Sequence, residues 1–254
     1  MEVNPFHYSI GTRVRIEPIV KMLEPKPGEN IIDVGSGLGY FTDLLAKSGA
    51  KCVGVDLDKL CISYCQKEMR GEYDIADVHC LPFPDNHFDK ALCTEVLEHV
   101  NLNGKILEEI RRVVKKGGTL VVSVPCSEGI FGSFFKRIGH DSVDGNSREY
   151  HWHKGYTLES INQLLEQYNF KSIDHYYTLV AATEAFMGIS KIVIRILRAK
   201  KIDSQANALE VNKTLLWKIY CRLFPLVLAG AWVERPLGKY IKGHMVVVKG
   251  FCEK

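Results

Sequence analysis

Two periodicities of hydrophobic residues alternate along most of this chain. Short, mostly apolar runs typical of buried strands occur at 31–34, 51–56, 74–79, 90–94, 119–124, 171–179 and 244–251. Apolar residues at helical spacing separate many of these runs, most clearly in the helix predicted over Asn103–Val114. Strands that alternate with helices favour a parallel sheet with helices on both faces. The sequence therefore predicts an α/β fold.

Further helices are predicted over Arg13–Leu23, Lys59–Met69 and Leu158–Tyr168. Pro18 lies inside the first of them, so we expect that helix to kink or restart there. A long insertion separates the last two predicted strands. We therefore divide the chain into a core of residues 1–182 and 243–254 and an insertion of residues 183–242.

The segment IIDVGSGLGY joins the first strand to a helix through three alternating glycines, Gly35, Gly37 and Gly39. Such a turn brings a ligand close to bare backbone N–H groups, which predicts a nucleotide-like ligand. A nicotinamide dinucleotide needs the spacing GxGxxG. Here Tyr40 occupies the position of the third glycine and Asp33 precedes the turn, so other motifs must identify the ligand.

Polar residues follow the next strands at the same predicted edge of the sheet. Asp56 ends the second strand, where a carboxylate can accept hydrogen bonds from both hydroxyls of a ribose. Asp77 can accept a hydrogen bond from an adenine amino group, beside the backbone N–H of Val78. Asp77 could equally cap a turn, and the neighbouring Leu57 could belong to the core. The motif CTEVLEHV then adds polar atoms after the fourth strand.

Four ordered motifs, DVGSGLG, GVDLD, DVHCLPFPDNHFD and TEVLEH, resemble those of the class I S-adenosylmethionine-dependent methyltransferases. The resemblance is strongest to the branch that includes ubiquinone and menaquinone biosynthesis methyltransferases. It implies a Rossmann-like, doubly wound, mostly parallel seven-stranded sheet, with an antiparallel last strand and a helical insertion before it. It also implies an N-terminal lid segment, in which Phe6, His7 and Tyr8 fold over the pocket.

The same resemblance implies which residues bind S-adenosylmethionine. Asp33 and the glycine turn would hold the methionine moiety, and Asp56 the ribose. Leu57 would pack on adenine, and Asp77 would bind its amino group. The full implied set is Asp33, Gly35, Gly37, Gly39, Asp56, Leu57, Asp77, Val78, Cys93 and Thr94.

Methyl transfer requires a positioned nucleophile, exclusion of water and, where needed, a group that takes a proton. His99 is the first candidate base, because it lies just past the cofactor edge and imidazole titrates near neutral pH. His151 and His153 flank Trp152 and could line a substrate pocket. Each of these three histidines could instead hold a loop together. The DPPY motif of amino-directed DNA methyltransferases is absent, which favours a carbon or oxygen nucleophile on a small molecule.

Charge is unevenly distributed along the chain. Residues 183–254 carry 13 Lys+Arg against 5 Asp+Glu, whereas the whole chain has a net charge of only +3. The basic C-terminal part indicates an anionic partner or surface, while the small total gives no argument for nucleic acid. The eight cysteines contain no CxxC pair and no secretory leader precedes them, so buried free thiols in a cytoplasmic protein are expected. The spacing of Cys126, His151 and His153 does not indicate a metal site.

The insertion contains two basic, amphipathic stretches, at 186–198 and 215–233. Lys218, Arg222 and Pro225 interrupt the second one, so a transmembrane helix is not expected. Such helices can make peripheral contact with an anionic membrane, cap a hydrophobic substrate pocket or form a dimer face.

The sequence therefore predicts an S-adenosylmethionine-dependent methyltransferase that acts at carbon or oxygen on a small, hydrophobic or lipid-like acceptor. A protein or RNA methyltransferase is one alternative, and a non-catalytic S-adenosylmethionine-binding regulatory module is the other.

Overall fold

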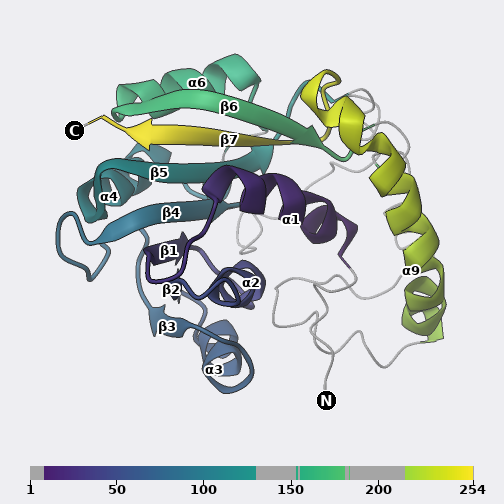
Figure 1. Cartoon of the computed structure of the whole chain (residues 1–254), viewed down its shortest axis with the longest axis horizontal. Helices are drawn as coiled ribbons and strands as arrows, with labels where there is room; N and C mark the ends of the chain where they lie inside the picture. Colours follow the sequence, from purple (N-terminus) through teal and green to yellow (C-terminus); the bar gives the residue numbers. More distant parts are fainter. Residues whose placement is uncertain (1–8, 130–152, 154, 181–182, 184–214, 254) are drawn as a thin grey trace.

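The computed structural model describes residues 9–129, 153, 155–180, 183 and 215–253. Seven strands form one sheet in the order β3-β2-β1-β4-β5-β7-β6 (Figure 1). Their bounds are β1 Asn30–Val34, β2 Lys51–Asp56, β3 Glu72–Ile75, β4 Phe88–Thr94, β5 Val114–Pro125, β6 Phe170–Thr178 and β7 Met245–Cys252. Strands β1 to β5 pair in parallel, whereas β7 is antiparallel to both of its neighbours. The predicted fold class, including the antiparallel last strand, is confirmed.

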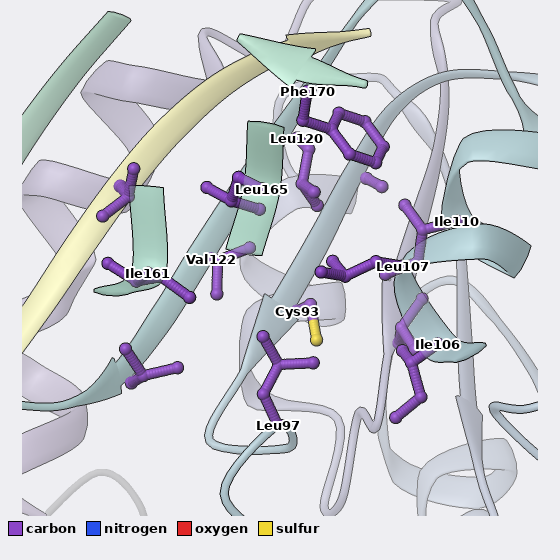
Figure 2. Close-up of a cluster of buried hydrophobic side chains, with 14 of the residues drawn as sticks. Cys93, Leu97, Ile106, Leu107, Ile110, Leu120, Val122, Ile161, Leu165 and Phe170 are labelled. Carbon is purple, nitrogen blue, oxygen red and sulfur yellow. The ribbon is translucent and has the colours of Figure 1, made fainter. Parts of the chain in front are cut away.

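Side chains alternate between the two faces of the sheet, as strand geometry requires. On one face, Leu92, Val121 and Val247 pack against α1 (Ile10–Leu23) and α2 (Tyr40–Ala46). The opposite face packs against α4 (Asn103–Val113) and α6 (Leu158–Gln167). Figure 2 shows this second layer, in which Ile106, Leu107 and Ile110 of α4 face side chains of the sheet. The third helix, α3 (Lys59–Glu68), packs beside β3 through Ile62, Cys65 and Tyr73.

The N-terminal helix is longer than predicted and does not restart at Pro18. It begins at Ile10, where the hydroxyl of Ser9 accepts a hydrogen bond from the backbone N–H of Thr12 at 3.3 Å. It then continues through Pro18 to Leu23, and Ile19, Met22 and Leu23 are buried against the sheet. This packing keeps the helix in one piece.

The insertion contributes a helix at the edge of the molecule. Helix α9 (Leu215–Glu234) is followed by the 3-10 helix η2 (Arg235–Lys239), which leads back toward β7. Figure 1 shows α9 at the end of the sheet where β6 finishes. The predicted helix at 186–198 lies outside the described residues, as do Phe6, His7 and Tyr8.

Three predictions about local structure were wrong. β3 ends at Ile75, not at 79, because the carboxylate of Asp77 accepts the N–H of His79 and turns the chain. β5 starts at Val114, not at 119, and passes through Gly117 with φ +74°. Cys80 is exposed, whereas Cys52, Cys61, Cys65, Cys93, Cys126 and Cys252 are buried and free as expected.

Candidate active site

The glycine turn lies between β1 and α2, at the carboxyl end of the parallel strands. Gly35, Gly37 and Gly39 have φ of +75°, +52° and +71°, a region in which side chains other than glycine are strained. The N–H groups of Gly35 and Ser36 both donate to the carbonyl of Val55 on β2, at 2.8 and 2.9 Å. The turn is therefore fixed to the neighbouring strand by its own backbone.

Two of the glycines are also required by close contacts. A Cβ at Gly35 would lie 2.3 Å from a methyl of Val96, in the segment after β4. A Cβ at Gly39 would lie 2.8 Å from both the sulfur of Cys65 and the hydroxyl of Tyr73. Both glycines therefore let this turn, which we call the cradle, pack closely against protein side chains.

Asp33 lies beneath this turn and is buried. Its Oδ2 accepts a hydrogen bond of 2.6 Å from the hydroxyl of Thr42 on α2, while its Oδ1 is buried without a hydrogen-bond partner among the described residues. Burial is the main cause that raises the pKa of Asp33 to about 6, and the charge of Asp56 adds to it. The carboxylate joins β1 to α2 directly under the cradle.

Asp56 connects the glycine turn to the second strand. Its Oδ2 accepts the N–H of Gly37 and its Oδ1 accepts the N–H of Asp58, both at 2.9 Å. A carboxylate has about four acceptor positions, so each oxygen retains capacity for a further donor. Next to it the side chain of Leu57 is 61% exposed, which is unusual for a large apolar residue that directly follows a buried strand.

Asp77 is exposed and caps its own turn, one of the two roles that the sequence left open. Its Oδ1 accepts the backbone N–H of His79 at 2.9 Å and lies 2.8 Å from the ring Nδ1 of the same residue. These two hydrogen bonds lower the pKa of Asp77. Neither contact uses Oδ2, and Val78 beside it is buried.

The fourth strand delivers Cys93 and Thr94 to the same edge. Cys93 is fully buried, and burial raises the pKa of its thiol. Thr94 is half-buried and pairs with Ser123 of β5. With the glycine turn and Asp56, these residues line the carboxyl ends of β1, β2 and β4.

The candidate histidines occupy different positions. His99 is half-buried and its backbone N–H donates to the carbonyl of Val96 at 3.0 Å. His153 contacts Asn103, with 3.2 Å between Nε2 and Nδ2, and packs against the ring of Tyr156. Its N–H also donates to the carbonyl of Glu98, so His153 attaches its own segment to the turn after β4. His151 lies outside the described residues.

Sequence reasoning missed an ion pair at this edge. The buried guanidinium of Arg15 on α1 donates to Glu95 Oε2 at 2.7 Å, to the hydroxyl of Ser123 at 3.2 Å and to the carbonyl of Gly11 at 2.9 Å. Glu95 directly follows β4, is 46% exposed and has φ +55°. Burial alone would raise the pKa of Glu95, but Arg15 outweighs this effect and lowers it, with further contributions from His99 and His244. The motif CTEVLEHV contains Glu95, but nothing in the sequence links it to Arg15.

A second glutamate, Glu98, lies three residues after Glu95, and its pKa is shifted in the opposite direction. Glu98 is buried, and its Oε2 has no hydrogen-bond partner among the described residues. Burial raises the pKa of Glu98 to about 8, so it is mostly neutral at pH 7. Two nearby carboxyl groups with pKa values shifted apart are typical of functional sites.

Comparison with known proteins agrees with this geometry. Residues 32–122 match the methyltransferase domain family. The demethylmenaquinone methyltransferase of Corynebacterium kroppenstedtii is 40% identical over 102 residues, which cover 40% of this chain and 44% of that protein. The ubiquinone biosynthesis O-methyltransferase of Coxiella burnetii is 31% identical over 127 residues, or 48% of this chain and 53% of that protein. The chain thus spans about half the length of these curated relatives.

A solved structure extends the likeness of the fold beyond the matched region. The S-adenosylmethionine-dependent methyltransferase of Thermotoga maritima aligns with a TM-score of 0.60 and 17% identity, over 97% of this chain and 91% of that one. At this identity the match shows the fold. Residues 32–122 therefore match a methyltransferase domain, and the chain shares the Rossmann-like fold of this solved structure.

Proposed function

We propose that this chain transfers a methyl group from S-adenosylmethionine to a carbon or oxygen atom of a small, hydrophobic acceptor. The observation that carries the proposal is the position of Asp56, hydrogen-bonded to Gly37 of the glycine turn. This carboxylate retains acceptor capacity for the two hydroxyls of a ribose, at the edge where the cradle begins.

The remaining residues fit the other parts of the same ligand. The exposed side chain of Leu57 offers an apolar surface to adenine, and Oδ2 of Asp77, which has no partner among the described residues, offers an acceptor to its amino group. The backbone of Gly35, Gly37 and Gly39 would lie along the methionine moiety, and the buried Asp33 supports the turn from below. Cys93 and Thr94 close this end of the site.

S-adenosylmethionine supplies a methyl group on a sulfonium sulfur, and the acceptor atom bonds to that carbon as the sulfur–carbon bond breaks. His99 is the proposed base that takes the proton of the acceptor, and Glu95 is close enough for its pKa to respond to the charge of His99. An ionised Glu95 would stabilise the imidazolium that forms. His151 and His153 remain proposed pocket residues, although the contacts of His153 favour an anchoring role.

The acceptor class rests on the relatives. Two of them are named for quinone biosynthesis, which involves small ring compounds with hydrophobic character. The basic insertion of residues 183–242 gives the chain a second feature suited to a lipid-like acceptor, namely the peripheral membrane contact predicted through 186–233. A chain bound at the membrane surface would reach an acceptor that resides in the membrane.

The cofactor proposal is tested by calorimetric titration with S-adenosylmethionine and S-adenosylhomocysteine. We expect Asp56→Ala to weaken binding at least about tenfold, which is about 1.4 kcal/mol. Asp56→Asn keeps one acceptor oxygen for Gly37 and should weaken binding less, while Asp74→Ala on the neighbouring strand is the matched control. Absence of heat from the wild type, or unchanged affinity in both Asp56 variants, would refute the cofactor site.

The acceptor is tested separately with labelled S-adenosylmethionine and cell extract. We expect label in the lipid or small-molecule fraction. Label in protein or RNA would show that the acceptor is a macromolecule and not a small molecule. Tight cofactor binding without any methyl transfer would favour a regulatory module.

A further inference from the structure

The outer face of α9 is apolar and exposed to solvent. Leu226, Trp232, Val233 and Tyr240 are 71%, 64%, 70% and 83% exposed, and Leu237 on η2 is exposed as well. Leu226, Val233, Leu237 and Tyr240 recur at intervals of three, four or seven residues, so they follow one side of the helix into η2. We call these four residues the α9 outer face, together with Trp232, which lines the cleft beside them. Isolated apolar side chains on a surface are common, but a continuous row of large ones indicates a binding surface.

The orientation of α9 is fixed by its inner side. Phe224 and Ala231 are buried with Ile10 of α1 and Met245 of β7. The carboxylate of Glu234 accepts hydrogen bonds from the N–H and the hydroxyl of Thr183, at 3.2 and 2.7 Å. Rotation of α9 to bury its outer face would therefore break an existing small core.

Positive charge borders this row. Arg222, Arg235 and Lys239 are exposed, and Arg235 forms an ion pair with Glu17 of α1. Glu234, the only acidic residue between 215 and 240, is engaged with Thr183 on the inner side. Beside Trp232 a cleft of about 600 Å³ separates α9 from α1 and α2. Arg13, Asp43 and Lys47 line it, and Lys47 forms an ion pair with Asp43. The guanidinium of Arg13 donates to the hydroxyl of Tyr40 and has no carboxylate partner in the described part of the chain.

We propose that the α9 outer face docks on the surface of an anionic lipid bilayer. Its apolar residues would enter the interface, and the basic residues beside them and around the cleft would meet lipid phosphates. Trp and Tyr suit this depth because each combines an apolar ring with a polar atom. None of the helices that the structure describes combines the length and hydropathy needed to cross a membrane, so contact at the surface is the mode that fits.

Charge distinguishes this partner from a second copy of the chain. In a two-fold dimer the same patch meets itself, so Arg222 and Lys239 would face like charges. An anionic bilayer instead complements Arg222 and Lys239, while Glu17 and Asp43 beside the cleft already form ion pairs with Arg235 and Lys47. This docking surface specifies which part of the chain makes the membrane contact named in the proposed function. It rests on the proposed function only for the idea that the acceptor is lipid-like.

The experiment is flotation of the full chain with vesicles of phosphatidylcholine, alone or mixed with phosphatidylglycerol. We expect at least about tenfold stronger binding to the anionic vesicles, and loss of most of this preference when salt rises from about 0.1 M to about 1 M. Trp232→Ser combined with Val233→Ser should weaken binding at least about tenfold. Phe251→Ser, an exposed aromatic residue near the end of β7, is the matched control.

A second pair of variants tests the charges. Arg222→Glu with Lys239→Glu should abolish the preference for anionic vesicles, whereas Lys51→Glu at the start of β2 should leave it intact. Calorimetry with S-adenosylmethionine on the same samples keeps the two proposals separate, because surface variants should retain cofactor affinity whether or not they float. No flotation of the wild type, equal flotation of the Trp232 variant, or self-association that this variant abolishes would overturn the docking surface.

Discussion

Gly35 and Gly117 have nearly the same φ angle but different surroundings. Their φ angles are +75° and +74°, yet a Cβ at Gly35 would lie 2.3 Å from Val96, and a Cβ at Gly117 would meet nothing within 4 Å. Gly117→Ala therefore measures conformational strain alone, about 1–2 kcal/mol. We expect Gly35→Ala to cost about 1–3 kcal/mol more in denaturant unfolding, and to weaken S-adenosylmethionine binding as well. Equal losses in the two variants would show that Val96 can move aside.

Glu98 predicts a specific pH dependence of stability. Its pKa is raised from 4.5 to about 8 in the folded chain, mainly by burial. The stability that this group contributes is fully present below pH 4.5 and is lost as the pH rises through about 8. At pH 7 the loss is roughly 3 kcal/mol at about 1.4 kcal/mol per pH unit.

Glu98→Gln removes the titrating group, so we expect the variant to lose less stability than the wild type between pH 4.5 and pH 8. Denaturant unfolding at several pH values measures the difference. Glu68→Gln, on the exposed side of α3, is the surface control. Parallel stability curves for wild type and Glu98→Gln would contradict the raised pKa.

The residues proposed for the cofactor could be selected from sequence because each lies near or just after the carboxyl end of a strand. To select Asp56 and Asp77, only the rule that the carboxyl ends of parallel strands meet at one edge of the sheet is needed. Arg15 could not be selected in this way, since it meets Glu95 only after α1 has packed across the sheet. The anchoring contacts of His153 likewise depend on Asn103, a residue distant in sequence.

The bounds of helices and strands were predicted well where the pattern of buried residues and the residue propensities indicate the same element. β2 was predicted at its observed bounds and α4 to within one residue, because each has a regular apolar pattern and a clear end. The pattern failed at β3, where Val78 is buried in a turn instead of a strand. It also missed the first turn of α1, which depends on the cap from Ser9.

The attachment of α1 to the sheet is testable by a double-mutant cycle. Arg15→Met removes three hydrogen bonds and should destabilise the chain by about 2–4 kcal/mol, because the guanidinium is buried. Glu95→Gln should cost less, since Glu95 is half exposed. We expect the double variant to lose less than the sum of the single ones, with a coupling of about 1 kcal/mol in denaturant unfolding. Lys21→Met, exposed on the same helix, is the control, and strict additivity would rule out the ion pair.

For the whole molecule, the insertion was predicted between the last two strands, but the way it joins the sheet needed the structure. β6 and β7 are antiparallel neighbours, and Thr178 pairs with Met245 across the two ends of the insertion. The N–H of His244 donates to the carbonyl of Leu179 at 3.1 Å, which continues the pairing one step further. The chain therefore leaves and re-enters the sheet at one point, as expected for an insertion into a hairpin.

Because the two ends of the insertion lie side by side, the predicted division into core and insertion can be tested by deletion. Replacement of residues 181–242 by a short turn containing Asn-Gly should leave a cooperatively folding core, because hairpin loops of two to about five residues suffice to join such strands. The variant should lose roughly 2 kcal/mol or more, since Phe224 no longer covers Ile10 and Met245. A companion variant with Ile10→Ser reduces the apolar surface that the deletion uncovers. We expect S-adenosylmethionine affinity to persist in calorimetry and vesicle binding to disappear. If neither variant folds, α9 belongs to the core and the division at 183 and 242 is wrong.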